Sequence, residues 1–271
     1  MTADQVKQLE TSTDPREVLT AALAAARSPE PADHERLQRH LQTPELLHRL
    51  DSEADYKDAA RFKLRVSRVV DALARNPLPS AHAAFVALTG DKVFLAEDER
   101  IVALLQASVH IRPAPPALVK FWDAHCQADD GFTPTTITAL LDNGSPPALV
   151  LLEKKLADPG HEEGDKISWM RSRILVHRND LPLLEASERM LAGTLPRALR
   201  PALVEALFDY RGEWYRPATV VSPPSLLSAS PEALAELRKV GELALKAVTL
   251  TGPQKKAVEA RLEEIKKLTP R

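Results

Sequence analysis

Two short polar segments of the chain hold residue types that bind metal ions or transfer protons. Their ligand-type residues are His125, Cys126, Asp129, Asp130, His161, Glu162, Glu163 and Asp165. Imidazole, thiolate and carboxylate groups are the usual protein ligands of transition metals, so a metal site is one interpretation of these segments. The other is that turns between helices are polar because they face water. We favour the second interpretation, treat Asp129, Asp130, Glu162 and Glu163 as exposed turn positions, and expect no bound metal or cofactor.

The common catalytic motifs are missing from the sequence. It contains no Gly-rich dinucleotide fingerprint, no phosphate-binding P-loop and no G-x-S-x-G nucleophile turn. His34-Glu35 begins the helical zinc motif H-E-x-x-H, but Gln38 occupies the position of the second histidine. Cys126 is the single cysteine, which excludes an internal disulfide and a zinc site with two thiolates, and we expect it to be a small, partly buried apolar residue. A non-enzymatic protein is favoured, while an enzyme whose residues meet only in the fold stays open.

Composition and charge narrow the class of protein further. The 36 basic and 38 acidic side chains give a net charge of −2, whereas nucleic-acid-binding domains usually carry a basic excess. A chain of 271 residues corresponds to one large domain or two small ones. No segment approaches the roughly 18 apolar residues of a membrane span, and the N-terminal sequence lacks the basic start and apolar core of a signal peptide. We therefore expect a cytoplasmic protein that does not act at a membrane.

The elements that must position any site are predicted to be helices. The chain has 22 prolines but only 9 glycines, and proline is well tolerated at the first position of a helix. Asp14 and Pro15, with Glu17 following, predict a helix over 15–27. The same start signal recurs at Thr43-Pro44, Thr133-Pro134, Ser145-Pro146, Ser230-Pro231 and Thr251-Gly252-Pro253. No segment of useful length alternates apolar and polar residues, so no strand is expected.

The middle of the chain repeats its own pattern. A run from Ile101 to Leu105 precedes Pro116, a similar run from Ile137 to Leu141 precedes Pro147, and a weaker copy surrounds Pro182. These prolines are 31 and 35 residues apart, a period typical of stacked helical pairs. The predicted first helices lie near 81–89, 116–126, 146–157 and 181–192, and the second helices near 97–109, 134–142, 164–177 and 196–209.

The segments Pro147–Asp158 and Leu181–Ala192 resemble the first helices of HEAT-like repeats. The usual Val-Arg pattern of the second helix is missing, so these are divergent repeats. The resemblance covers residues 80–210 and implies an all-α, right-handed α-solenoid of antiparallel helix pairs, a curved scaffold for binding other macromolecules. It implies no reaction, because a fold does not determine a function.

The domain organisation follows from this pattern. Residues 1–79 form N-terminal helices continuous with the solenoid, and residues 80–210 form the helical pairs. A Pro/Ser-rich loop occupies 211–230, and a C-terminal helical pair over 231–271 caps the stack with a polar outer face.

The loop at 211–230 carries the most prominent aromatic cluster. Arg211, Trp214, Tyr215 and Arg216 are the residue types enriched at binding hot spots. Alternatively, Trp214 and Tyr215 fold back to seal the last repeat, since large aromatic side chains are mostly buried.

A basic stripe marks the helix predicted over 54–75. Its members are Lys57, Arg61, Arg65, Arg68 and Arg75. The stripe could follow nucleic-acid phosphates, and a HEAT-like glycosylase for alkylated bases offers an analogy. Such an enzyme needs an aromatic residue and a carboxylate around the extruded base, for which the candidates are Trp122 with Asp123, and Trp169. Because Asp58 and Asp71 interrupt the stripe, we favour a solvated helix face.

Stacked pairs would also place all turns of one kind along one edge. The acids of the turns from first to second helices are Asp91, Glu97, Asp98, Asp129, Asp130, Asp158, Glu162, Glu163 and Asp165. The other turns hold His110, Arg112, His177, Arg178, Arg211 and Arg216, opposed by Asp142, Asp180 and Glu213. The sequence thus predicts a non-enzymatic scaffold that binds another protein through Asp129, Asp130, Glu162, Glu163 and the aromatic loop. The alternative is a HEAT-like protein for nucleic-acid binding or base excision.

Overall fold

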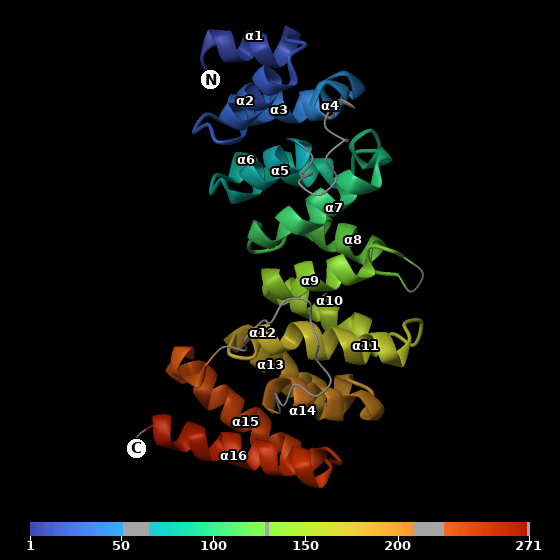
Figure 1. Ribbon diagram of the computed structural model, residues 1–271, viewed down its shortest axis with the longest axis vertical. Helices are drawn as coiled ribbons and strands as arrows, with labels where there is room; N and C mark the ends of the chain where they lie inside the picture. Colours follow the sequence, from blue (N-terminus) through green and yellow to red (C-terminus); the bar gives the residue numbers. More distant parts are fainter. Residues whose placement is uncertain (51–64, 128–129, 209–224, 270–271) are drawn as a thin grey trace. The chain divides into compact units, whose positions relative to one another are not determined.

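The computed structural model describes residues 1–50, 65–127, 130–208 and 225–269 of the chain (Figure 1). These residues form α-, 3₁₀- and π-helices and contain no strand, which confirms the all-α prediction for the described part of the chain. No helix in these ranges is both long and apolar enough to cross a membrane. The chain divides into two compact units, Met1–Ala124 and His125–Arg271.

The first unit is built from helices that pack in two layers. Its α-helices are α1 (Ala3–Thr11), α2 (Pro15–Ala26), α3 (Pro31–Leu41), α4 (Pro44–Leu50), α5 (Arg65–Arg75), α6 (Pro79–Leu88), α7 (Asp98–Ala107) and α8 (Pro116–Ala124). In one layer α2 packs on α5 and α5 on α7, while α3 packs on α6 in the other. The contacts of α2 with α3 and of α5 with α6 join the layers, so the apolar core lies between them.

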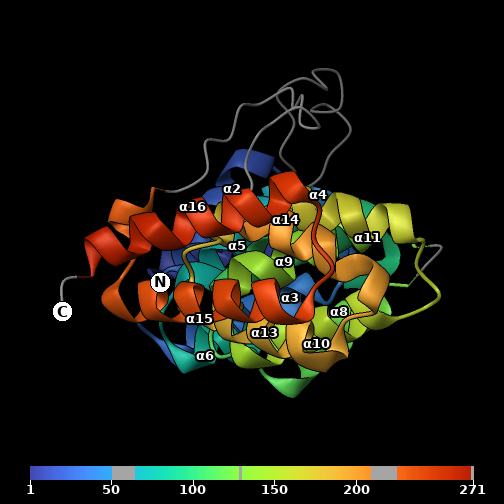
Figure 2. The ribbon, with the colours of Figure 1, turned by 90° about the horizontal axis from the view of Figure 1, so that it is seen from below.

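The second unit repeats this organisation. Its α-helices are α9 (Thr133–Asn143), α10 (Pro146–Ala157), α11 (Glu163–Trp169), α12 (Leu175–His177), α13 (Leu181–Arg189), α14 (Arg200–Phe208), α15 (Pro231–Ala247) and α16 (Gly252–Leu268). A π-helical turn, Met170–Ile174, joins α11 to α12, and a second, Met190–Thr194, extends α13. One layer contains α10, α13 and α15, and the other contains α9, the first π-helical turn, α14 and α16. Figure 2 shows both layers of this unit edge-on.

The start signals read from the sequence place the helices correctly. Asp14 accepts a hydrogen bond from the Arg16 backbone N–H at 2.8 Å, and Pro15 opens α2. Thr251 and Gln254 form a complete capping box at the start of α16. Ser145 departs from the expected pattern, because its hydroxyl bonds the side chain of Asn143 at 2.5 Å instead of capping α10. Proline at the first turn is therefore the signal these starts share, and the capping bond is not always present.

The eight helices predicted for residues 80–210 are all present within a few residues of their expected bounds. Gly144 ends α9 in the left-handed conformation, with φ of 62°, which explains a glycine at this turn. The boundary between the two units falls between α8 and α9, which the sequence assigns to one pair. The predicted repeat pattern and the predicted domain bounds, 1–79, 80–210, 211–230 and 231–271, stay predictions. The contacts within each unit do not show whether the helical pairs continue from one unit to the next.

Candidate functional site

The turn between α10 and α11 presents an exposed group of the carboxylates predicted from the sequence. Glu162, Glu163 and Asp165 are exposed, and all three lie at the start of α11. The positive end of a helix dipole favours acidic groups at this position. The Asp158 carboxylate accepts a hydrogen bond from the Gly160 N–H at 2.8 Å, which lowers the pKa of Asp158 below its usual value. The Asp158 carboxylate thus fixes the backbone of the turn that precedes the three exposed acids.

Buried side chains pack against the inner side of this turn. Lys155 and Lys166 are 2% and 4% exposed, and the Lys166 ammonium donates to the backbone carbonyl of Asp158. His161 is also buried and packs edge-on against Trp169, with ring centroids 5.2 Å apart. Because these groups face the interior, they anchor the turn, while its acids remain exposed to solvent.

The segment before α9 has a different role from the one expected. Asp130 is half-buried, and its Oδ1 accepts a hydrogen bond from the Phe132 N–H at 2.8 Å. Its Oδ2 lies 3.7 Å from the Nδ1 of His125. The expectation that Asp130 is an exposed turn residue is therefore wrong, since its carboxylate organises the start of α9. Cys126 is fully buried, and Asp129 lies outside the described residues.

The two turns lie on one edge of the second unit. Figures 1 and 2 both show the starts of α9 and α11 at the same side of this unit. Within the described ranges, no group of three or more histidine, cysteine, aspartate or glutamate side chains could hold a metal ion. The two segments that suggested a metal site therefore share an edge without forming a common cluster there.

His177, at the other end of the α11–α12 helix, is paired on both sides. Its Nε2 lies 2.9 Å from Asp142 and its Nδ1 lies 2.8 Å from Asp180. Burial disfavours the charged ring, but the two hydrogen bonds outweigh burial and raise the pKa of His177 to about 9. Arg178 is only 5% exposed. Of the cations expected to form a basic edge in this unit, His177 is therefore compensated and Arg178 is buried, while Arg211 and Arg216 lie outside the described residues.

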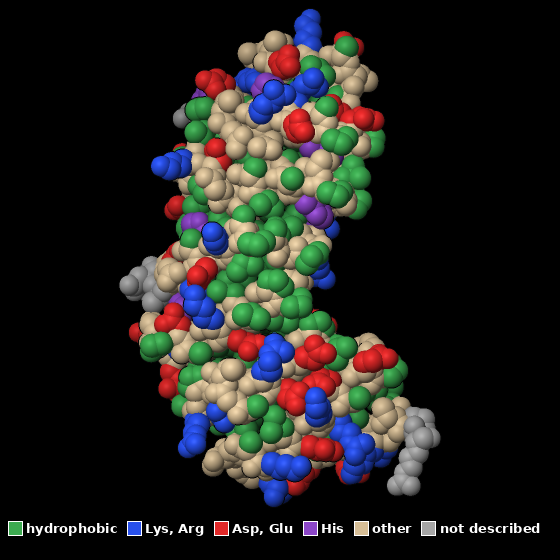
Figure 3. Space-filling model, turned by 180° about the vertical axis from the view of Figure 1, so that it is seen from behind, with side chains coloured by type: hydrophobic (Ala, Val, Ile, Leu, Met, Phe, Trp, Pro, Cys, Tyr) green, Lys and Arg blue, Asp and Glu red, His purple; other side chains and the backbone are tan. Residues whose placement is uncertain are grey.

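A second compensated cluster lies across α13 and α15. The Lys239 ammonium is 2.8 Å from Glu188 and 3.5 Å from Glu236. Burial raises the pKa of Glu236, and the hydrogen bond to Lys239 lowers the pKa of Glu188. Figure 3 shows this face, where acidic and basic side chains lie side by side. The cluster joins two helices of one layer.

Only some residues of the basic stripe have side chains that are available to a ligand. Arg65 donates to the backbone carbonyl of Leu50 at 2.8 Å, while Lys57 and Arg61 lie outside the described residues. Arg68 and Arg75 line a cavity of about 350 Å³ together with Arg27 of α2. Sequence reasoning missed Arg27, because nothing along the chain indicates which side chain of another helix faces the stripe.

The aromatic candidates for base stacking are not free. Trp122 is fully buried, and its Nε1 donates to the Ser108 hydroxyl at 3.0 Å. Trp169 is half-buried against His161, and Asp123 is half-buried. Trp122 therefore has no ring face open to an extruded base. The loop candidates Arg211, Trp214, Tyr215 and Arg216 lie outside the described residues.

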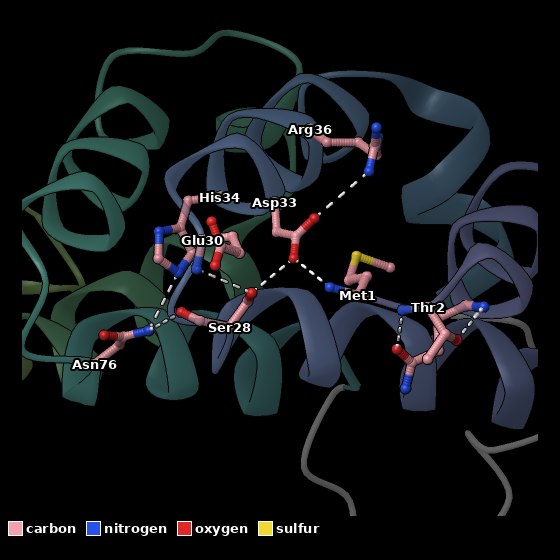
Figure 4. Close-up of polar contacts among 9 residues, drawn as sticks. Met1, Thr2, Ser28, Glu30, Asp33, His34, Arg36 and Asn76 are labelled. Carbon is pink, nitrogen blue, oxygen red and sulfur yellow. Dashed lines mark hydrogen bonds and ion pairs between the residues drawn. The ribbon is translucent and has the colours of Figure 1, made fainter.

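A buried polar network in the first unit went unnoticed in the sequence. Figure 4 shows His34 and Asn76 beside Ser28 and Asp33, which accepts a hydrogen bond from the N-terminal amine. The Oδ1 of Asn76 accepts the Leu78 N–H, while its Nδ2 donates to the Ala26 carbonyl at 2.9 Å and lies 3.2 Å from the His34 Nε2. On the other side of the ring, the His34 Nδ1 lies 2.8 Å from the Ser80 hydroxyl oxygen.

The environment of His34 favours its neutral ring, because burial lowers the pKa of this histidine. Its two ring nitrogens lie within hydrogen-bond distance of Ser80 and Asn76. The network is therefore a hydrogen-bonded junction of the α2–α3 turn, α3 and the α5–α6 turn. Its only sequence signal was polar residues at positions that helical periodicity places toward the core.

Comparisons with known proteins do not assign the chain to a family. No family model matches it, and neither curated proteins nor solved structures gave a match.

Proposed function

We propose that the chain is a non-enzymatic scaffold of HEAT-like helical pairs, stacked as a right-handed α-solenoid, that binds another protein. The observation that carries this proposal is the order of packing within each unit. Helices of one layer contact their counterparts in the next pair, from α2 to α5 to α7 and from α10 to α13 to α15. Repeat scaffolds are stabilised in this way, because each pair buries its apolar face only against its neighbours.

A binding role agrees with the chemistry of the titratable groups. His34 lies within hydrogen-bond distance of Ser80 and Asn76, and His177 is held between two aspartates. Each of these two histidines contacts residues of neighbouring helices or turns. By contrast, Glu162, Glu163 and Asp165 are exposed on an anchored turn, where they are available to a partner.

The acidic turn, defined as Glu162, Glu163 and Asp165, favours a partner with a basic surface. Complementary charge steers association and selects partners more than it adds affinity. Binding through this turn should therefore weaken with added salt, because exposed charges are screened within about 10 Å at roughly 0.1 M salt.

The proposal is tested by capture from a lysate of the source cells after nuclease treatment. The wild-type protein is compared with Glu162→Lys/Glu163→Lys and with a control, Glu185→Lys/Glu232→Lys, which changes exposed acids of α13 and α15 and gives the same net charge. We expect a protein that the wild type and the control retain and the first variant loses. Equal retention by all three, or loss of all binding on nuclease treatment, contradicts the proposal.

A further inference from the structure

The cavity between α2 and α5 combines an apolar floor with a charged wall. It has a volume of about 350 Å³, and Leu23, Ala72 and Pro77 supply apolar surface. The wall carries Arg27, Arg68, Arg75 and Asp71. Small-molecule sites commonly have volumes of about 300 to 1,000 Å³ and a few polar groups that converge on the ligand. The cavity is therefore large enough for a compact ligand.

Two of the three guanidinium groups are not used by the fold. The Nε of Arg75 lies 2.8 Å from the Asp71 carboxylate, and this pair largely neutralises itself. Arg27, which caps the C-terminal end of α2, and Arg68 of α5 are exposed, and their side chains have no hydrogen bond or ion pair within the described ranges. Both line this cavity, although they are far apart in the sequence.

The surroundings of the cavity are positive. Three arginines and one aspartate give two net positive charges, and the C-terminal ends of α2 and α5 each offset about half a charge. His110 lies 3.8 Å from Asp71. Burial lowers the pKa of His110, and Arg75 and Arg112 lower it further although Asp71 opposes them. The cationic form of this histidine is disfavoured beside a site that attracts anions.

We propose that Arg27 and Arg68 bind the phosphate group of a small phosphorylated molecule in the cavity between α2 and α5. Guanidinium groups bind phosphate through paired, charge-assisted hydrogen bonds, and their planar shape makes them better suited to this than lysine. Convergence of two helices on one cavity fits a compact phosphate or diphosphate better than an extended nucleic-acid backbone. This site lies in the first unit and does not depend on the scaffold function proposed for the acidic turn.

The test uses pyrophosphate as the probe, titrated into the full chain at low ionic strength and followed by calorimetry and by NMR of the histidine rings. We expect saturable binding at one site. Arg27→Gln/Arg68→Gln should weaken it by at least about tenfold, the effect of losing one charge-assisted contact. The control Arg16→Gln/Arg39→Gln removes two exposed arginines of α2 and α3 away from the cavity and should bind as the wild type does. Thermal melts of both variants show whether either substitution disturbs folding.

The His110 ring gives a second readout. An anion in the cavity should raise the pKa of His110 in the wild type and the control, and leave it unchanged in Arg27→Gln/Arg68→Gln. Absence of saturable binding, or equal binding by both variants, overturns the proposal. So does a DNA duplex that binds through the same two arginines and is not displaced by pyrophosphate, because the surface would then be a nucleic-acid track.

Discussion

The Nε2 atom of His177 lies 2.9 Å from a carboxylate oxygen of Asp142, so the end of α12 is bound directly to the end of α9. The Nδ1 atom of the same ring bonds Asp180, the residue that precedes α13. One imidazolium thus joins three helices of the second unit where their turns meet.

The stability of the protein should fall as pH rises through the pKa of His177. This pKa is raised from 6.5 to about 9 in the folded state, so the stabilisation is complete below about pH 6.5 and is lost above about pH 9. Its upper limit lies between about 3 and 4 kcal/mol, from about 1.4 kcal/mol per unit of pKa. Urea unfolding at several pH values measures it. His177→Gln should lose less stability over this range than the wild type, and an equal loss in both would contradict the pairing.

Asn76→Ala should destabilise the first unit by at least about 2 kcal/mol. The amide donates to the Ala26 carbonyl at 2.9 Å and accepts the Leu78 N–H, and each buried group left unpaired costs about 1 to 3 kcal/mol. Gln38→Ala is the control, since Gln38 is half-buried and its side chain makes one long hydrogen bond in the described part of the chain, to Gln42 at 3.4 Å. Denaturant unfolding compares the two variants, and similar stabilities would show that the network contributes little.

Gly241→Ala and Gly164→Ala should change stability in opposite directions. A Cβ at Gly241 would lie 2.9 Å from Leu262 and 3.2 Å from the ring of Phe208, whereas one at Gly164 meets nothing within 4 Å. Overpacking costs typically about 1 to 3 kcal/mol, which exceeds the gain of about 1 kcal/mol in helix propensity. We expect Gly241→Ala to lower the melting temperature and Gly164→Ala to raise it slightly. A stabilising Gly241→Ala would show that α15 and α16 are not closely packed at this point.

Trp122→Ala should cost about 3 to 5 kcal/mol, the usual range for truncating a buried aromatic residue. Trp122→Phe keeps most of the packing and removes the hydrogen bond to Ser108, so its cost should be nearer 1 kcal/mol. Equilibrium unfolding separates the two effects. If both variants are as stable as the wild type, Trp122 is available for another role.

The sequence predicts the helices well because their signals are local. Pro15 after Asp14 and Pro231 after Ser230 each mark a helix start within one residue of its position in the structure. Helical periodicity also predicts a Leu- and Ala-rich core, and leucines such as Leu104 and Leu184 are fully buried. These features depend on residues a few positions apart, so no knowledge of packing is needed.

The sites are predicted less well because they depend on contacts between distant residues. Asp142 and His177 were read as opposing charges on one edge, but nothing in their spacing showed that one ring would bond two carboxylates. Arg27 reaches the cavity only because α2 packs on α5. The sequence predicts Asp130 to be an exposed turn acid. Its carboxylate instead accepts a hydrogen bond from the Phe132 N–H, and this bond depends on a turn geometry that the sequence does not show.

Zero-length coupling of carboxylates to amines tests the central claim, protein binding through the acidic turn, most directly. The captured complex is treated with a carbodiimide, digested and analysed by mass spectrometry. We predict that Glu162, Glu163 or Asp165 becomes joined to lysines of the partner, and that these links disappear at high salt. Links confined to acids on other surfaces, such as Glu185 or Glu232, with the acidic turn unmodified by the partner, would contradict the account.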